Sequence, residues 1–448
     1  MLNLPSELAD REQPVRVGVV GAGLFGSNLV TQLEAAAGME TAAIADIRTE
    51  KAVETFGRAG VGREQVTVAA GKSEAETLIA EGRRAVLADG VDLATADVDV
   101  LVEATGVPSV AARHAFEAIM ADTHVVMATV EADTVVGPFL AELAERNGVA
   151  YSMAYGDQPA LIAELVDWAE TVGLEVVAAG KGVPFRESFH HGTPDDVFER
   201  LGFEESFVES RGLNAEMYNS FVDGTKVAVE MCAVANATGL RPDVPGMHLP
   251  TAETQEIPAT LRPESDGGIL SSTGVVDTVS TLYPDGSSVD PDRDISFGVF
   301  VVTRSPHQHV REYLTQYAGP GHHVAGDGEY QVFYRPHHLP GLETGVSVAS
   351  AAVRGEPTGT PRERVAEVVG AAKRDLSPGE ELDGGGGRTV YGLLVDADTA
   401  DDERYVPFEL LEGATVTAEV GQDERLTGKH VDLEETFLSR LRSTSDAR

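Results

Sequence analysis

The stretch Val15–Gly38, "VRVGVVGAGLFGSNLVTQLEAAAG", decides the fold of the N-terminal region. Its apolar start, Val15–Val20, runs directly into Gly21, Gly23 and Gly26, and the residues that follow have a helical pattern. Glycines at this spacing let the backbone approach a pyrophosphate, and the helix N-terminus offers it free N–H groups and a positive dipole. The stretch therefore predicts a dinucleotide-binding turn. A glycine turn that only packs the helix on the strand is the alternative.

A second strand, within "METAAIADIR", follows the helix and ends at Asp46, about 20 residues after Gly26. This is the spacing of a carboxylate that binds the ribose of a dinucleotide. A carboxylate accepts hydrogen bonds from the 2′-hydroxyl of NAD and repels the 2′-phosphate of NADP, whereas Arg48 could hold that phosphate. The residues therefore leave NADP or NAD open as the cofactor.

Helical and strand-like segments continue to alternate, which predicts a doubly wound parallel (Rossmann) sheet within an α/β domain of residues 1–156. Ligands of such sheets bind at the carboxyl ends of the strands. The turns Glu103–Pro108 and Ala128–Asp133 follow two strands and should line the nicotinamide half of the site, although their carboxylates could be ordinary turn residues. The predicted cofactor-binding residues are Gly21, Gly23, Leu24, Phe25, Gly26, Asp46, Arg48, Ala104, Thr105 and Gly106.

Composition limits the class of protein. A chain of 448 residues exceeds one hydrophobic core, so two or three domains are expected. A net charge of -39, spread along the chain, argues against nucleic-acid binding and suggests a halophilic protein with an acidic surface. Only six of the 34 basic residues are lysines. The single cysteine, Cys232, and the lack of a signal-like or long apolar segment favour a cytoplasmic protein without a membrane partner.

The segment Met217–Gly239 is strongly apolar and reads as one helix, yet it contains Asp223, Lys226 and Glu230 on a single predicted face. A lysine in an apolar setting suits proton transfer to an alkoxide formed by hydride transfer, because burial lowers its pKa. Asp223 and Glu230 would orient the ammonium group. An ordinary surface stripe of salt bridges is the alternative. Lys181, just past a predicted strand, is the second catalytic candidate.

The segment around Lys181 also predicts an anion site. Arg186, His190 and His191 lie close together in a polar loop and could bind a phosphate or carboxylate of a substrate. The histidines occur as adjacent pairs, which on a strand point to opposite faces, so no metal site is predicted. An α+β domain for substrate binding and dimerisation is expected over residues 157–355.

A Gly/Pro/Thr linker, "RGEPTGTP", precedes the C-terminal region. Its segment Ala371–Gly384, "AAKRDLSPGEELDG", resembles the SAF domain, a small β-rich module, expected here over residues 362–448. A generic hairpin with a Pro-Gly turn is the alternative.

The order of these parts resembles the homoserine dehydrogenase-like oxidoreductases with a C-terminal SAF domain, and among them the 1-deoxy-D-xylulose 5-phosphate reductoisomerase-like proteins. The motifs that carry the resemblance are "GVVGAGLFGSNLV", "VEATGVP", "GDQPALIAEL", "SFVDGTKVAVEMCAVANATG", "YRPHHLPGLET" and "KRDLSPGEELDG". The resemblance implies a homodimeric, NADP-linked enzyme that acts on a small hydroxy-carbonyl compound such as a polyol, sugar acid or sugar phosphate. It also implies that Asp223 and Lys226 match the acid and lysine of homoserine dehydrogenases. Oxidation of an amino alcohol and a non-enzymatic nucleotide-sensing scaffold are the alternatives.

Overall fold

The computed structural model describes residues 3–326 and 328–447, which divide into two compact units. Unit 1 comprises Met1–Leu161, Leu339–Arg362 and Thr436–Arg448, and unit 2 comprises Ile162–His338 and Glu363–Glu435. This division differs from the expected succession of domains 1–156, 157–355 and 362–448. The chain returns to unit 1 twice, once in a helix that packs on its sheet and once in a helix that packs on two of its helices.

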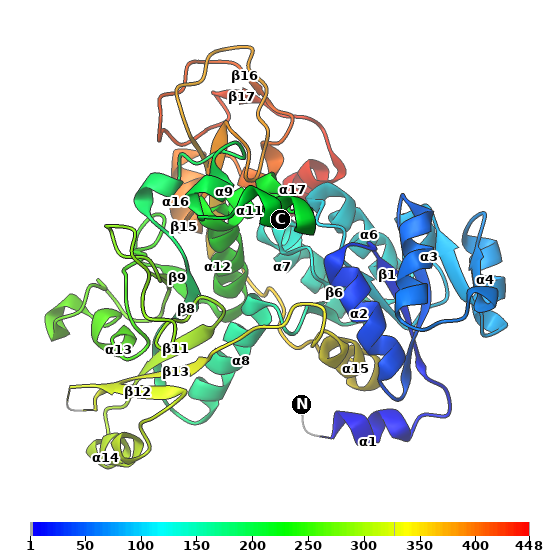
Figure 1. Cartoon of the computed structure of the whole chain (residues 1–448), viewed down its shortest axis with the longest axis horizontal. Helices are drawn as coiled ribbons and strands as arrows, with labels where there is room; N and C mark the ends of the chain where they lie inside the picture. Colours follow the sequence, from blue (N-terminus) through cyan, green and yellow to red (C-terminus); the bar gives the residue numbers. More distant parts are fainter. Residues whose placement is uncertain (1–2, 327, 448) are drawn as a thin grey trace. The chain divides into compact units, whose positions relative to one another are not determined.

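Unit 1 is built on a seven-stranded sheet in the order β3-β4-β2-β1-β5-β6-β7, with every neighbouring pair parallel (Figure 1). Its strands are β1 (Val15–Val20), β2 (Met39–Ala45), β3 (Val66–Val68), β4 (Arg84–Leu87), β5 (Val100–Glu103), β6 (His124–Met127) and β7 (Tyr151–Met153). Apart from the edge strand β3, whose Val68 is 47% exposed, the strands are mostly buried and apolar, as expected when helices cover both faces of a parallel sheet. The doubly wound sheet predicted from the sequence is confirmed.

Helices follow the strands of unit 1 in turn: α2 (Leu24–Ala35), α3 (Thr49–Arg58), α4 (Lys72–Ala80), α5 (Gly90–Ala94), α6 (Pro108–Met120) and α7 (Val130–Asn147). Three further helices come from the ends of the chain and from its middle: α1 (Leu4–Ala9), α15 (Gly345–Arg354) and α17 (Phe437–Asp446). Helix α15 adds Val348 and Ala351 to the core, and Phe437 of α17 packs edge-on against Phe116 of α6 at 5.7 Å. These apolar contacts explain why residues after 435 fold with unit 1 and not with the C-terminal module.

Unit 2 contains a six-stranded mixed sheet in the order β12-β13-β11-β8-β10-β9. Its strands are β8 (Glu175–Val183), β9 (Arg241–Pro242), β10 (Val275–Ser280), β11 (Val299–Arg304), β12 (His322–Ala325) and β13 (Tyr330–Arg335). β8 and β10 run parallel, whereas β11 runs antiparallel to β8. The α+β class expected for the middle of the chain is therefore observed.

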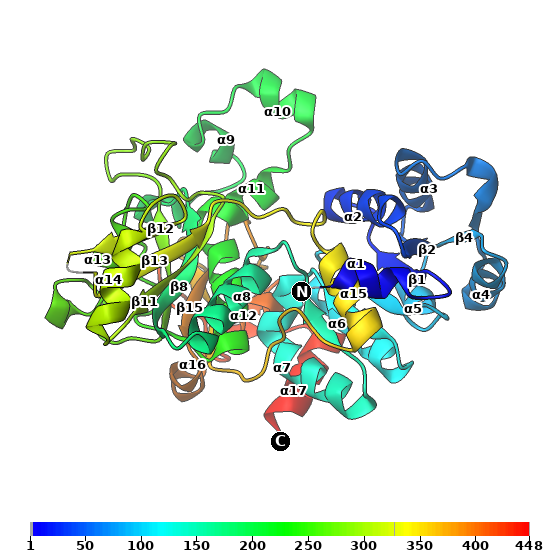
Figure 2. The ribbon, with the colours of Figure 1, turned by 90° about the horizontal axis from the view of Figure 1, so that it is seen from below.

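The remaining strands of unit 2 form two antiparallel pairs, β14 (Ala366–Ala372) with β15 (Val390–Asp396), and β16 (Thr415–Val416) with β17 (Val431–Asp432). The helices are α8 (Gln158–Thr171, which starts in unit 1), α9 (Val197–Arg200), α10 (Glu205–Arg211), α11 (Ala215–Val222), α12 (Thr225–Thr238), α13 (Ile257–Thr260), α14 (Gln308–Gln316) and α16 (Ala397–Glu403). α12 packs against β10, β14 and β15, while α9 and α10 stand away from the sheet (Figure 2). No helix in the described part of the chain is long and apolar enough to cross a membrane.

Asp133 of α7 is a buried carboxyl group within unit 1. It is 1% exposed, and its Oδ1 accepts a hydrogen bond from the Tyr151 hydroxyl at 2.5 Å, while its Oδ2 has no hydrogen-bond partner among the described residues. Burial raises the pKa of Asp133 to about 7, with the Tyr151 hydrogen bond acting in the opposite direction. The folded protein therefore binds a proton at Asp133 more tightly than the unfolded chain does.

This difference makes stability fall as pH rises. The contribution of Asp133 is fully present below its ordinary pKa of 3.8 and is lost as pH rises through about 7. The free energy of unfolding should drop by on the order of 4 kcal/mol from this group across that range. Urea unfolding between pH 4 and pH 8 should show a clearly smaller decline for Asp133→Asn. The exposed Asp122→Asn should keep the parent slope, and equal slopes for all three proteins would contradict the assignment.

Candidate active site

The glycine turn of unit 1 has the geometry of a phosphate site. Gly21 adopts a φ of 103°, and an added Cβ would lie 2.5 Å from the Ala104 carbonyl oxygen. A Cβ on Gly26 would lie 2.0 Å from the Gly21 carbonyl oxygen, so neither position accepts a side chain. Gly23, the N-cap of α2, has open space within 4 Å of its Cβ position. The turn is thus closed on its protein side and open on the side where a pyrophosphate would bind.

Asp46 lies beside this turn, directly after β2. Its Oδ2 accepts a hydrogen bond from the Ala22 N–H at 2.9 Å, and its Oδ1 accepts one from the Arg48 N–H at 2.8 Å. The carboxylate is therefore fixed next to the glycines, while the Arg48 side chain is exposed. Of the other predicted cofactor residues, Leu24 is 80% exposed at the start of α2, and Phe25 packs partly against the unit 1 core.

Ala104, Thr105 and Gly106 form the turn after β5, next to Gly21. The carboxylate of Glu103 at the end of β5 is fully buried and accepts hydrogen bonds from the hydroxyl groups of Thr105 and Thr129. This carboxylate ties together the turns after β5 and β6, which is a structural role.

Residues 217–239 do not form the single helix predicted from the sequence. Helix α11 ends at Val222, Asp223 is its C-cap, and α12 begins at Thr225. Gly224 between them has a φ of 94°, and its Cβ position would lie 2.9 Å from His190 Cε1. A glycine with a left-handed conformation ends helices because other residues adopt it at a cost. The prediction that Asp223 shares one helical face with Lys226 and Glu230 was therefore wrong.

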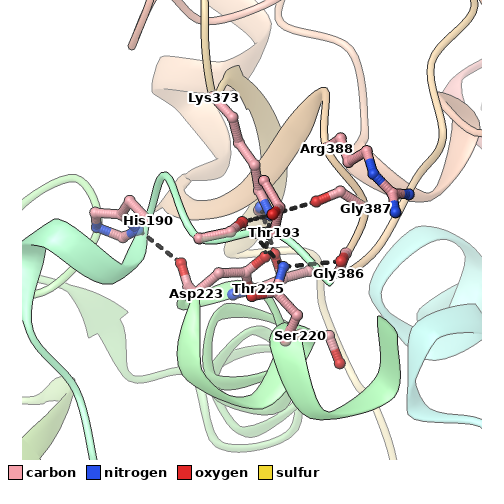
Figure 3. A network of polar contacts seen from close by, with 12 residues as sticks. His190, Thr193, Ser220, Asp223, Thr225, Lys373, Gly386, Gly387 and Arg388 are labelled. Atoms are coloured by element: carbon pink, nitrogen blue, oxygen red, sulfur yellow. Dashed lines mark hydrogen bonds and ion pairs between the residues drawn. The ribbon is translucent and has the colours of Figure 1, made fainter. Parts of the chain in front are cut away.

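Asp223 instead forms a buried ion pair with Lys373, which the sequence analysis did not select. Lys373 Nζ donates hydrogen bonds to Asp223 Oδ2 at 2.8 Å, to the Gly192 carbonyl oxygen at 2.8 Å and to the Gly387 carbonyl oxygen at 2.7 Å (Figure 3). The two side chains are 3% and 0% exposed. All three ammonium hydrogens are used, so Lys373 holds its own segment to two distant ones, at Gly192 and Asp223, instead of serving as a proton donor.

Glu230 pairs with the other catalytic candidate. Lys181 Nζ of β8 lies 2.5 Å from Glu230 Oε2 of α12, and both side chains are nearly buried. Lys226 lies in the first turn of α12, four residues before Glu230, and is half-buried. Lys226 and Glu230 therefore share the helical face that the sequence predicted for them, and Glu230 links this face to β8.

The predicted anion loop follows β8 and borders a cavity of about 600 Å³ within unit 2. Arg186 and His190 line this cavity, whereas His191 lies outside its lining and pairs with Asp423 at 2.7 Å. Ser280, at the end of β10, also lines it, so the cavity lies at the carboxyl ends of the parallel strands β8 and β10, where α/β sheets bind ligands. In residues 3–326 and 328–447, no group of three or more His, Cys, Asp or Glu side chains could hold a metal ion.

Two family matches account for most of the chain. Residues 21–154 match the NAD-binding domain of homoserine dehydrogenase, and residues 156–344 match the catalytic domain of oxidoreductase DRL. The chain is an NAD(P)-dependent oxidoreductase of the dehydrogenase type. It combines a homoserine dehydrogenase-type nucleotide domain with a DRL-type catalytic domain, which confirms the resemblance found in the sequence. The SAF module stays a prediction.

No curated protein matches the chain, and the solved structures that match it do so at low identity and low TM-score. 1-Deoxy-D-xylulose 5-phosphate reductoisomerase from Zymomonas mobilis in complex with NADPH is 13% identical, with 76% of this chain and 80% of that chain covered and a TM-score of 0.35. A probable dehydrogenase from Thermotoga maritima is 13% identical, with 64% and 72% covered and a TM-score of 0.36. Scyllo-inositol dehydrogenase from Lactobacillus casei is 11% identical, with 65% and 74% covered and a TM-score of 0.33.

Removing the Lys373 ammonium group should destabilise unit 2. Lys373→Met leaves the carboxylate of Asp223 buried without its cation, which should lower the free energy of unfolding in urea by about 3–5 kcal/mol. The double variant Lys373→Met/Asp223→Asn should recover part of this loss. Arg374→Met, which breaks the exposed pair with Glu380, should cost less than about 1 kcal/mol. Equal effects of the two single variants would contradict the structural role of Lys373.

The open space at Gly23 allows a test of cofactor binding that spares the fold. Gly23 has a φ of -74°, so Gly23→Leu should fold normally while its side chain occupies the space in front of the α2 N-terminus. Fluorescence titration should show that the parent binds NADH, NADPH or both, and that Gly23→Leu binds neither. Gly57→Leu, at an exposed α3 position with open space, should bind as the parent does. Cofactor binding that survives in Gly23→Leu would contradict this site.

Proposed function

We propose that this oxidoreductase transfers a hydride between a nicotinamide cofactor and a small hydroxy-carbonyl compound, namely a polyol, sugar acid or sugar phosphate. The observation that carries the proposal is the unit 2 cavity at the ends of β8 and β10, in the domain that matches an oxidoreductase catalytic domain. Gly21, Gly23, Gly26 and Asp46 hold the cofactor, which supplies or accepts the hydride. Residues of unit 2 bind the substrate and move its proton.

Lys226 is the proposed proton donor to the substrate oxygen. A half-buried lysine can contact a ligand and transfer a proton to its oxygen. It lies two residues after Gly224, which contacts the cavity residue His190. Lys181 is nearly buried and paired with Glu230, so these two act as positioning groups for the same face of α12. Asp223 positions this region from the buried ion pair with Lys373.

Arg186 and His190 are the proposed substrate-binding residues, since both line the cavity. His191, which pairs with Asp423, would bind substrate only by leaving that partner. The runner-up substrate class is homoserine or a similar amino alcohol, favoured by the match of the nucleotide domain to homoserine dehydrogenase. Both family matches describe oxidoreductases, so the scaffold alternative is set aside. A cytoplasmic homodimer without nucleic-acid or membrane partners is part of the proposal.

A panel of polyols, sugar acids, sugar phosphates and amino alcohols, followed by nicotinamide absorbance, tests the proposal. With the substrate that is turned over, Lys226→Ala should lower kcat by on the order of a hundredfold because the proton donor is lost. Lys226→Arg should not restore the rate, since arginine does not release a proton near neutral pH.

The exposed Lys429→Ala is the matched control and should keep the parent kcat. Cofactor titration should be unchanged in every lysine variant, because the cofactor residues lie in unit 1. A parent-like kcat in Lys226→Ala would remove Lys226 from the chemistry and favour Lys181. Turnover of no member of the panel by the parent would overturn the proposed substrate classes.

A further inference from the structure

A series of aromatic rings crosses one edge of unit 2. Tyr313 of α14 and Tyr317, which follows this helix, have ring centroids 4.8 Å apart. The ring of His322, in the edge strand β12, forms a hydrogen bond with the backbone of Tyr317 and stacks on Phe333 of β13 at 4.3 Å. Phe333 in turn meets Trp168 of α8 edge-on at 4.8 Å. These five residues form an aromatic strip that runs from α14, beside β12 in Figure 1, to α8.

Both ends of the aromatic strip face solvent. Tyr313 and Tyr317 are 53% and 65% exposed at one end, and Trp168 is 40% exposed at the other. Val172, one helical turn after Trp168, is also exposed and extends the apolar surface. Exposed apolar side chains that lie together mark interaction surfaces, and Tyr and Trp are the residues that contribute most to binding there.

Helix α14 is covered on little of its surface by the described part of the chain. None of its nine residues, Gln308–Gln316, is buried, and only Val310, Arg311 and Leu314 are half-buried. A helix of this length is marginally stable without packing, since isolated helices need about 12–15 residues. A surface that covered the two tyrosines would therefore stabilise the helix as well.

The α14 end of the strip contains few acidic residues. Residues 299–326 include a single acid, Glu312, whereas 73 acids in a chain of 448 residues would place about four or five in a segment of this length. The two arginines of the segment pair with acids at 3.0 and 3.1 Å. This surface is therefore almost uncharged in a protein with a net charge of -39, in which most surfaces of two copies repel each other.

The α8 end is acidic instead. Residues 162–175 contain four acids and no lysine or arginine, and Asp167 and Glu170 are exposed close to Trp168 in sequence. A second copy that docked with α8 against α8 would bring these acids together, which is unfavourable. A reversed copy instead brings its α14 end to the acids, where the exposed His307 and His309 can donate hydrogen bonds to carboxylates. The strip thus complements itself in the orientation that a two-fold axis produces.

We propose that the aromatic strip is the surface through which two copies of this chain associate, with α14 of each copy over α8 of the other. The proposal deepens the homodimer that is part of the proposed function and rests on it only for the number of copies. Burial of the tyrosines and of Trp168 supplies the attraction, and the arrangement of charge sets the orientation.

A second aromatic surface of unit 2 is disfavoured by its charge. Phe207 of α10 and Phe221 of α11 are exposed and belong to a cluster of aromatic rings. Residues 195–216, which contain α10, hold seven acids and only two arginines. Two copies that met at this surface would therefore repel each other.

Sedimentation equilibrium of the full-length protein in potassium chloride, over a range of protein concentrations, tests the proposal. The parent should be a dimer. Tyr317→Glu and Tyr313→Glu should each raise the dimer Kd by on the order of a thousandfold. Loss of a central aromatic side chain weakens an interface about thirtyfold, and a two-fold interface carries each substitution twice. Tyr317→Phe keeps the ring and should remain dimeric.

Phe207→Glu is the matched control, because it places the same acid at an exposed aromatic position of the other surface. It should remain dimeric. The far-UV circular dichroism of all variants should match that of the parent, since the substituted side chains are exposed.

Trp168 is the only tryptophan of the chain and reports on the α8 end without any substitution. Its emission in the parent should shift to longer wavelengths on dilution below the dimer Kd, because the indole ring becomes exposed to water. Tyr317→Glu should show the shifted emission at concentrations where the parent is a dimer. If neither glutamate variant folded, the emission of the parent would decide the matter.

A monomeric parent would overturn the proposal, and so would a dimer that survives in both glutamate variants or that dissociates without a change in Trp168 emission. Dissociation of Phe207→Glu but not of Tyr317→Glu would assign the interface to α10 and would also overturn it. The expected pattern without turnover of any hydroxy-carbonyl compound would leave the interface in place and reject the proposed function. A monomeric parent that turns over a substrate would reject the interface alone.

Discussion

The ammonium group of Lys373 is buried and carries three hydrogens, so the fold of unit 2 must bring three acceptors to one point. The acceptors come from the loop after β8, from the junction of α11 and α12, and from the turn after residue 385. An ammonium group left without them would cost several kcal/mol, and so would the carboxylate of Asp223 alone. This requirement couples the segment of Lys373 to Asp223 and Gly192, which lie 150 and 181 residues earlier in the sequence.

The junction of α11 and α12 also determines which ring nitrogen of His190 carries the hydrogen. The carbonyl oxygen of Asp223 holds Nδ1–H, and Tyr391 of the C-terminal segment supports the ring face. His248 faces the same cavity with its Nδ1 against a carboxylate instead of a carbonyl oxygen. His190 therefore has a lone pair at Nε2, whereas both ring nitrogens of His248 face carboxylates, those of Asp277 and Asp243. Asp223 and Asp277, which lie outside the cavity lining, thus orient two rings of that lining.

The sequence predicted the nucleotide unit well because its signals are local. β1 has the predicted bounds Val15–Val20, and Gly21 and Gly26 are glycines for steric reasons that the motif already implies. The cavity was predicted only in part. Arg186 and His190 were found because they are neighbours in sequence, whereas His248 lies about 60 residues later and has no motif of its own. Its partner Asp277 belongs to β10, and only strand pairing with β8 brings that strand to the Arg186 loop.

The prediction that the three charges of residues 223–230 share one helical face was wrong for a related reason. Spacing on a helix predicts which side chains share a face, but it does not predict their partners. Here α11 ends at Val222, and Gly224 separates Asp223 from the helix that carries Lys226 and Glu230. The scarcity of lysine in the sequence was a second signal for residues with a structural role. Lysine is scarce in this chain, and the two lysines that are buried, Lys181 and Lys373, both pair with carboxylates of α12 or its N-terminal junction. Arginine cannot replace Lys373, because its planar fork has five donors and the pocket offers three acceptors around one atom. A compact ammonium group is therefore required at Lys181 and Lys373, whereas the exposed Lys429 shows that the residue type alone does not mark such a place. Lys226 is a candidate because of its position on α12 and not because it is a lysine.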